Sequence, residues 1–282
     1  MLCSQLTHQQ TLLKKLRRQI LQEAIEGKLT ADFRTQNPDI EPAGKLLSRI
    51  KAEKEQLIKE KKIRKQKPLP PISEEEKSFK LPEGWVWCRV REFASHYVDC
   101  PHDTPKYQDR GFPCLRAPDI TESGLLINTV RRVSKEEYEK RIRRLNPIRN
   151  DLVYIREGGR LGIAGLIDTD EHICLGQRVM MLRFSNEFSA KYALRFFNAP
   201  MTYDGIVGKI IGSASPHVNV RDIISHVIPV PPLPEQKAIV TKVNKLLSLC
   251  DQLETQITTH QTHSGQLMQA VLKEAFQQSE AE

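Results

Sequence analysis

The sequence predicts an α+β protein that combines one mixed α/β domain with long helices that form a coiled coil. Apolar residues repeat at alternating steps of four and three over residues 239–271, short β-branched and aromatic runs alternate with turns over residues 81–230, and two amphipathic helical patterns precede them. We therefore expect an N-terminal helical region at 1–77, an α/β domain at 78–232 and a C-terminal coiled-coil helix at 233–282.

The N-terminal region contains two helical patterns separated by a loop. Apolar residues at three- and four-residue steps predict a helix over Leu6–Ile25, with Gly27 as its C-terminal cap. A second helix is expected over Gly44–Lys67, because apolar positions recur there under a charged exterior and the prolines at 68, 70 and 71 end the pattern.

The central region has the texture of a mixed α/β domain. Its short apolar runs, bounded by turn residues, predict strands, and two longer periodic stretches predict helices. The expected strands are Trp85–Val90, Leu125–Val130, Leu152–Ile155, Ile163–Ile167, Val179–Phe184 and Val227–Val230, and the expected helices are Ser134–Leu145 and Glu187–Asn198.

The C-terminal helix carries the seam of a coiled coil, and a seam needs a partner helix. A helix over Glu235–Phe276 would be ~60 Å long at 1.5 Å per residue. Residues 16–25 and 267–276 share a short helical pattern, which suggests a unit that repeats in a longer ancestor or by dimerisation. The expected seam residues are Leu16, Ile20, Ile239, Val243, Leu246, Cys250, Leu253, Ile257, Leu267 and Val271.

The positive charge of the chain is gathered into two stretches. The 282 residues carry a formal net charge of +8, whereas residues 49–67 alone hold nine basic and three acidic side chains and residues 131–149 hold eight and three. Such patches favour a polyanionic partner, most commonly nucleic acid, although a solvated helix face gives the same pattern. No apolar run is long enough to cross a membrane, and six scattered cysteines suit a reducing cytoplasm.

Motifs for catalysis or cofactor binding are absent from the sequence. It contains no glycine-rich phosphate loop and no Asn-Pro-Pro-Tyr tetrapeptide of an adenine methyltransferase, and Asp119 lacks the nearby partners of a nuclease centre. His96, Cys100, His102 and Cys114 lack the paired short spacings of a zinc site, and Cys100 and His102 are too close together for two tetrahedral ligands. The sequence therefore predicts a binding protein with no catalytic residues, no metal and no cofactor.

Several motifs resemble those of type I restriction–modification specificity subunits. The α/β domain opens with LPEGWVW at 81–87 and closes with VPPLPEQ at 230–236, which resemble the boundary motifs of that family. Segments at 24–29 and 50–70 resemble its conserved helical region. Internal motifs of one class of target-recognition domain resemble DCPHDTP at 99–105, REGGRLG at 156–162, LGQR at 175–178 and GSASPHVN at 212–219.

The resemblance implies a non-catalytic subunit that reads double-stranded DNA and docks methyltransferase (modification) subunits and, through them, the restriction/translocase subunit. Such subunits usually carry two recognition domains, and this chain has one. The resemblance therefore implies a natural half-subunit that forms a homodimer, a fragment of a longer gene, or one half that pairs with another half-subunit. A cytoplasmic location without a membrane follows.

Residue types suggest which positions would contact DNA in such a subunit. Arginine can bind guanine bidentately and asparagine can pair with adenine, and glycines let a loop approach closely. We expect base reading by Arg156, Arg160, Ser213, Ser215, His217 and Asn219, and backbone contacts by Lys106, Tyr107, Arg110, Arg116, Arg178 and Lys209.

Other interpretations stay open at this point. Arg156 and Arg160 also suit a structural salt bridge. The whole chain also suits a coiled-coil adaptor or scaffold that binds protein partners, or a degenerate fragment. Steeply salt-dependent binding to duplex DNA would separate the recognition subunit from the adaptor.

Overall fold

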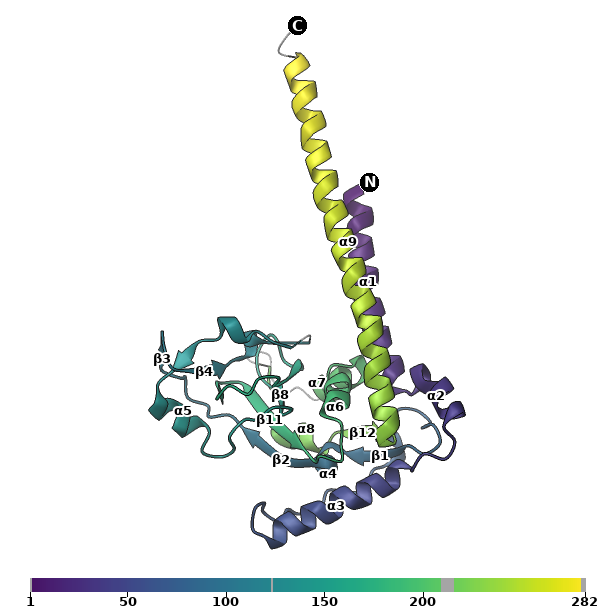
Figure 1. Ribbon diagram of the computed structural model, residues 1–282, viewed down its shortest axis with the longest axis vertical. Coiled ribbons are helices and arrows are strands. Elements are labelled where there is room, and N and C mark those ends of the chain that lie inside the picture. The colour runs from purple at the N-terminus through teal and green to yellow at the C-terminus, as the bar shows by residue number, and fades with distance from the viewer. Residues whose placement is uncertain (1, 123, 209–215, 280–282) are drawn as a thin grey trace. The chain divides into compact units, whose positions relative to one another are not determined.

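The computed structural model describes residues 2–122, 124–208 and 216–279, and its mixture of helices and strands confirms the α+β class (Figure 1). The chain divides into two compact units, residues 1–20 with 241–282 and residues 21–240. The α-helices are α1 (Leu2–Ile25), α2 (Ala31–Gln36), α3 (Ala43–Lys59), α4 (Val90–Phe93), α5 (Lys135–Arg141), α6 (Ala190–Phe197), α7 (Pro200–Val207), α8 (Val220–Ser225) and α9 (Leu233–Ser279). The strands are β1 (Val86–Arg89), β2 (Ala94–Asp99), β3 (Tyr107–Gln108), β4 (Phe112–Leu115), β5 (Ile120–Thr121), β6 (Gly124–Leu125), β7 (Arg132–Val133), β8 (Leu152–Ile155), β9 (Ala164–Leu166), β10 (Cys174–Leu175), β11 (Val179–Phe184) and β12 (Val227–Val230).

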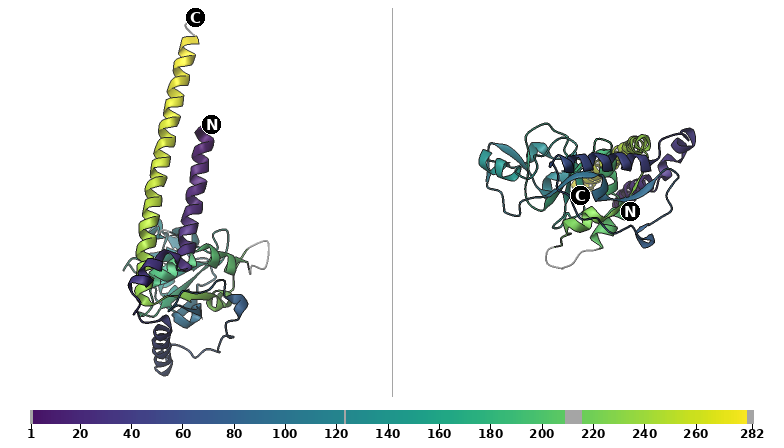
Figure 2. Two further views of the ribbon diagram at one scale, coloured as in Figure 1. Left: turned by 90° about the vertical axis from the view of Figure 1, so that its right-hand side faces the viewer. Right: turned by 90° about the horizontal axis from the view of Figure 1, so that it is seen from below.

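The smaller unit is an antiparallel pair formed by α1 and α9 of the same chain (Figures 1 and 2). Arg17 of α1 donates to Asp251 at 2.6 Å and to Glu254 at 2.9 Å, and Gln10 donates to Gln261 at 3.2 Å. Residue numbers fall along one helix as they rise along the other, so the two helices run in opposite directions. The antiparallel partner of the long helix is therefore α1, whereas the second N-terminal helix, α3, packs against α4 in the larger unit.

Only part of the expected seam is buried. Ile20, Ile239, Val243 and Cys250 are buried, and Leu246 and Ile257 are half-buried. Leu16 was expected in the seam but is 44% exposed. The buried residue on this turn of α1 is Leu13, three positions earlier, so the seam follows a neighbouring row of side chains. Leu253 and Leu267 are also exposed, and the side chain of Val271 lies outside the described residues.

The larger unit contains two four-stranded sheets. One has the strand order β2-β11-β8-β9 and is antiparallel throughout, and the other has the order β10-β4-β7-β3 with one parallel pair, β10 and β4. Strands β5 and β6 form a small hairpin. Every residue of β8 is buried, as expected for a strand covered on both faces.

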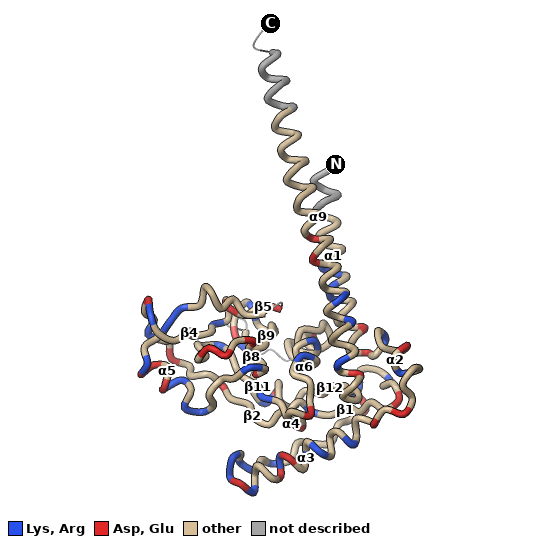
Figure 3. The backbone as a smooth tube through the Cα atoms, in the orientation of Figure 1, with Lys and Arg blue, Asp and Glu red and all other residues tan. Residues whose placement is uncertain are grey.

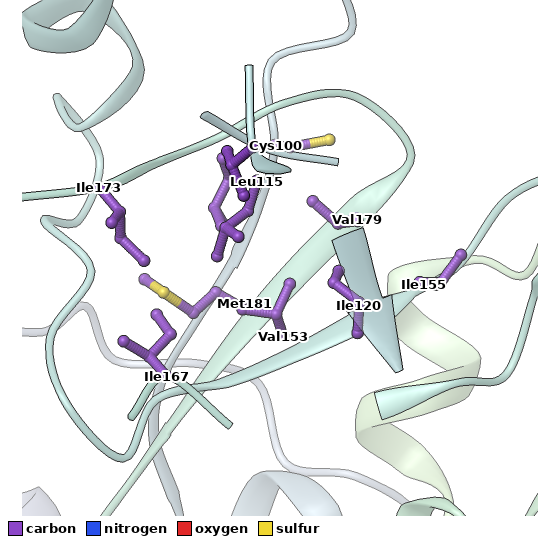
Figure 4. Close-up of a cluster of buried hydrophobic side chains, with 11 residues drawn as sticks. Cys100, Leu115, Ile120, Val153, Ile155, Ile167, Ile173, Val179 and Met181 are labelled. Carbon is purple, nitrogen blue, oxygen red and sulfur yellow. The ribbon is translucent and has the colours of Figure 1, made fainter. Parts of the chain in front are cut away.

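One buried hydrophobic cluster of this unit joins residues from both sheets (Figure 4). Val153 of β8 and Met181 of β11 come from one sheet, and Leu115 of β4 comes from the other. Ile120 of β5 and Ile167 after β9 complete the cluster. Burying each of these aliphatic side chains contributes roughly 1.5–3 kcal/mol, so this cluster fixes how the loops at the sheet ends are placed.

The two boundary motifs of the α/β domain meet in space. Strand β1 pairs with β12, with Val86 opposite Val230, so the first and last strands of the domain form one ladder. Immediately afterwards Glu235, in the first turn of α9, is fully buried. Its carboxylate accepts hydrogen bonds from Trp85 Nε1 at 2.7 Å, Thr30 Oγ1 at 2.7 Å and Arg34 Nη1 at 2.5 Å. One carboxylate thus joins three segments of the chain around the start of α9.

Several element ends differ from the sequence expectation. Helix α3 ends at Lys59 rather than Lys67, because Lys61 takes a left-handed φ of 58° and the amide of Lys62 bonds back to the carbonyl of Leu57 at 2.9 Å. This is a Schellman ending, which the lysine run did not predict. The expected strand Leu125–Val130 is also wrong. After β6 the chain forms a 3-10 turn at Ile127–Thr129, and its apolar side chains pack on the core without a ladder.

Candidate nucleic-acid interface

The loop between β8 and β9 is shaped by two glycines. Gly158 and Gly162 have φ values of +88° and +94°, which other residues rarely adopt. A side-chain carbon on Gly162 would lie 2.5 Å from Cδ2 of Tyr203. The amide of Gly162 donates to the carbonyl of Ile155 at 2.9 Å, which closes the loop. The two glycines therefore allow a tight turn, and Gly162 lets the backbone of this loop pack close to Tyr203.

A second predicted segment lies directly beside this loop. The amide of Gly158 donates to the carbonyl of Pro216 at 2.9 Å, and the amide of Val218 donates to the carbonyl of Arg156 at 2.9 Å. His217 and Asn219 on this segment are exposed. Ser213, Ser215 and Lys209 lie outside the described residues.

Arg156 is 6% exposed, unlike the side chain of a base reader. Its guanidinium binds the Asp99 carboxylate with two nitrogens, at 2.7 and 2.9 Å, and contacts Glu157 at 2.8 Å. A further donor reaches the carbonyl of Val218 at 3.4 Å. Its donors are thus directed at other parts of the protein, as in the structural salt bridge that the sequence also allowed, and they join β2, the loop and the 216–219 segment.

Arg160 has the opposite placement, because it is exposed at the tip of the loop. One nitrogen donates to the carbonyl of Ile120 at 2.7 Å, which is the single hydrogen bond that this side chain makes to the described residues. An arginine has five N–H donors, so most of this guanidinium can still bind a ligand.

Two further segments complete the surface. Arg178 is exposed, with φ of 67°, and its guanidinium nitrogen lies 3.6 Å from the point where a side-chain carbon on Gly158 would sit. The neighbouring Gln177 donates to the His102 carbonyl at 2.8 Å and to Thr104 Oγ1 at 3.0 Å. Four segments far apart in the sequence therefore meet here, and we call them the motif cluster: residues 99–105, 156–162, 175–178 and 216–219.

Tyr107 and Arg116 lie in a neighbouring stack of aromatic and cationic groups. The Tyr107 ring has the guanidinium carbons of Arg131 and Arg116 at 5.1 and 5.8 Å from its centroid. Arg116 also binds Asp119 with two nitrogens, each at 2.9 Å. Burial raises the pKa of the Tyr107 phenol, so the hydroxyl stays protonated at neutral pH. Both side chains have structural partners, whereas Lys106 and Arg110 are exposed.

The basic stretch at residues 131–149 is largely neutralised by carboxylates. Arg141 of α5 is buried and binds Glu137 at 2.7 Å. Figure 3 shows red and blue segments side by side in this region. Lys140 hydrogen-bonds Asp103, which lowers the pKa of that carboxyl group. Further ion pairs join Arg149 to Asp170 at 2.8 Å and Arg132 to Glu171 at 3.3 Å. This stretch therefore has less free positive charge than its composition indicates.

Within residues 2–122, 124–208 and 216–279, no group of three or more His, Cys, Asp and Glu side chains is placed to hold a metal ion. Burial raises the pKa of the Cys100 thiol to about 11, so it is not a thiolate nucleophile at neutral pH. None of the described helices is long and apolar enough to cross a membrane.

The comparison with protein families decides what kind of domain this is. Residues 82–260 match the family model described as the type I restriction modification DNA specificity domain. The chain belongs to this family. The match begins at the first boundary motif and extends into α9, so this specificity domain includes the Glu235 junction and the motif cluster.

Curated relatives of this specificity domain are longer proteins. The chain is 35% identical over 269 residues to the type I restriction enzyme EcoAI specificity subunit of Escherichia coli, covering 92% of this chain and 44% of that subunit. It is 30% identical over 282 residues to the EcoEI specificity subunit of the same species, covering 93% and 45%. The chain thus spans about half the length of these relatives.

A solved structure shares the fold. A chain from the work titled "Structural basis underlying complex assembly and conformational transition of the type I R-M system" aligns with a TM-score of 0.55 at 19% identity. The alignment covers 82% of this chain and 54% of that one.

Sequence reasoning missed two side chains of the motif cluster. His102 is exposed and lies 3.1 Å from the Asp99 carboxylate, and Gln177 ties the 99–105 segment to the 175–178 segment. Both lie inside motifs that carry the family resemblance, and this was the signal that could have found them.

Proposed function

We propose that this chain is the DNA-reading subunit of a type I restriction–modification complex, which recognises one half of a bipartite duplex target and catalyses no reaction itself. It works in the cytoplasm and docks methyltransferase subunits, and through them the restriction/translocase subunit. Family membership and the names of the relatives support this proposal. The observation that carries it is the motif cluster, in which four separate segments place exposed hydrogen-bonding side chains beside one another.

Base reading is assigned to the exposed side chains of the cluster. Arg160 has donors available for the major-groove edge of guanine, and Asn219 has the amide that pairs with adenine. His217 is exposed on the 216–219 segment, and the expected readers Ser213 and Ser215 precede it in the sequence. Arg156 holds the reading loop in place through Asp99, so its contribution to specificity is indirect.

Contacts to phosphates are assigned to exposed cations within and beside the cluster. Lys106, Arg110 and Arg178 are exposed, and Lys209 is included from its sequence position. Such contacts position a protein on DNA and make its affinity depend on salt, but they do not read sequence. Tyr107 and Arg116 support these contacts from their stack.

The test compares a proposed base reader with a proposed phosphate contact in the assembled complex. Arg160→Ala should weaken binding to the cognate duplex by ~1–3 kcal/mol and change binding to random duplex little. Lys106→Ala is the matched control and should weaken binding to both duplexes equally. Equal losses on both duplexes for Arg160→Ala would assign Arg160 to the phosphates instead.

A second half-subunit, either another copy of this chain or a different one, is proposed to pair with the helices α1 and α9. Leu16 lies three residues from the buried Leu13, and Leu253 lies three residues from the buried Cys250, so each is rotated about 60° from the seam in the same sense. In an antiparallel pair this rotation turns both side chains to one side, where Leu12 and Leu249 extend the apolar stripe; the four are 44–49% exposed. A second copy, or another half-subunit, would cover this stripe and set the distance between two half-sites.

Solution mass tests the pairing. The purified chain of 32.3 kDa should sediment as a dimer, or should form a one-to-one pair with another half-subunit. Leu16→Lys with Leu253→Lys should abolish pairing without loss of helicity. Pairing that survives this double substitution would contradict the assignment of the stripe.

A further inference from the structure

Strand β2 is an edge strand with one unpaired side. Within the described chain it pairs with β11 alone, from Ala94 opposite Phe184 to Asp99 opposite Met180. The amide of Cys100 bonds to the carbonyl of Val179, so the backbone groups of Asp99 and Tyr97, one and three residues earlier, face away from β11. The carbonyl of Asp99 accordingly accepts a hydrogen bond from Arg144 on that outer side, at 3.3 Å. The backbone of Tyr97 lies two residues further along the same open edge.

A groove of about 460 Å3 lies along this edge. Helix α3 forms one wall, the turn after α3 closes the end, and residues 94–97 of β2 form the opposite wall. The apolar lining includes Leu47 and Ile58 of α3 and Ile63 of the turn. Arg91 holds the far end of this turn by donating to the carbonyl of Lys67 at 2.7 Å.

The groove is positively charged. Its lining includes five basic side chains, namely Lys51, Lys54, Arg64, Lys65 and Arg91, and two acidic ones, Glu55 and Glu92. Lys54 donates to the carbonyl of Arg91 at 2.5 Å rather than to a carboxylate. Burial lowers the pKa of the Lys54 ammonium group to about 8. A carboxylate brought near the protonated lysine would therefore stabilise its charge. Glu92 is already engaged, because it accepts from the backbone amide of Arg89 at 2.6 Å.

We propose that this groove binds an extended, acidic peptide segment of a partner protein, which adds to β2 as a further strand. A groove between an edge strand and a helix offers backbone hydrogen bonds on one side and apolar contacts on the other, and this combination suits strand addition. The excess of cations selects acidic side chains. Duplex DNA would use the cations alone, and it would leave the apolar wall and the strand edge unmatched.

This inference is independent of the proposed DNA reading. The groove lining and the motif cluster share no residue. Strand β2 connects them, because its Ala94 lines the groove and its Asp99 belongs to the cluster. Loss of peptide binding should therefore leave sequence-specific DNA binding intact, and the two proposals can fail separately.

The test uses a fluorescent decapeptide of alternating valine and glutamate and the full chain. Fluorescence anisotropy should show saturable binding, and Lys51→Glu with Lys65→Glu should weaken it at least tenfold. Lys45→Glu with Lys59→Glu is the matched control, since it makes the same change of charge on α3 outside the groove lining and should leave binding unchanged. Absence of saturable binding up to millimolar peptide, or equal binding of a valine–lysine peptide, would overturn the proposal.

Two further readouts separate strand addition from other modes of binding. Two peptides methylated on alternate backbone nitrogens, one on the odd-numbered and one on the even-numbered residues, should behave differently. One should lose binding and the other should keep it, because only one set of amides faces β2. Hydrogen exchange at the amide of Tyr97 should slow when the peptide is bound. Binding that is insensitive to methylation, or competition by random duplex DNA at low salt with full loss of peptide binding, would contradict strand addition.

Discussion

The buried carboxylate of Glu235 should be among the most sensitive positions of the specificity domain. Glu235→Gln keeps the size of the side chain but removes its charge and replaces one acceptor oxygen by a donor. If the remaining oxygen faces Thr30 and Arg34, the amide group of the glutamine opposes the indole N–H of Trp85, which bonds the second oxygen at 2.7 Å in the native chain. Breaking a buried ion pair from one side costs about 3–5 kcal/mol.

Urea unfolding followed by tryptophan fluorescence measures this loss, since Trp85 is itself one partner. At a urea m-value of about 2.5 kcal/mol/M, a loss of about 3–5 kcal/mol in the free energy of unfolding lowers the unfolding midpoint by roughly 1–2 M. Glu41→Gln is the matched control, because its carboxylate also binds an arginine, Arg49 at 2.6 Å, but both side chains are nearly half exposed. That variant should hardly move the midpoint. Equal midpoints for the two variants would refute the view that Glu235 joins the ends of the domain.

Two further predictions concern backbone and buried charge. Gly162→Ala should destabilise the chain by roughly 1–3 kcal/mol in urea unfolding, because of its positive φ and the Tyr203 ring 2.5 Å from the new carbon, whereas Gly159→Ala, with no atom within 4 Å, should be almost neutral. Equal effects would show that the loop adapts freely. Lys54→Met should stabilise the chain by about 1–3 kcal/mol at pH 7. The pKa of Lys54 is lowered from 10.5 to about 8 on folding, so the unfolded chain binds more protons between these values and the stability of the native chain rises with pH there. The advantage of Lys54→Met should therefore shrink from pH 8 to 10.5, and an advantage independent of pH would contradict this cause.

Local patterns predicted many elements of the fold because their causes are local. Alternating and continuous apolar runs gave β8, β11 and β12 at their observed bounds, and the left-handed φ of Gly27, +73°, is the one expected of a helix cap. The end of α3 was missed because a lysine, not a glycine, takes the left-handed position at Lys61. The strand predicted at 125–130 was wrong because β-branched residues can also pack on a core one at a time, without a neighbouring strand.

The candidate site was predictable in composition but not in roles. Glycines and arginines marked the 156–162 loop, and the motif at 216–219 marked its neighbour. The burial of Arg156 depends on Asp99, 57 residues earlier in the chain, and no local pattern contains that contact. The exposed Arg160 and the buried Arg156 have similar sequence surroundings, so only the long-range fold separates a candidate reader from a support.

Selection of duplexes from a randomised library by the assembled complex tests sequence reading by this chain most directly. Bound molecules should converge on a short defined base sequence, and Arg160→Ala should relax the preference at one position of it. Retained duplex binding with no enriched sequence would rule out base reading by this chain, because it would leave only phosphate contacts.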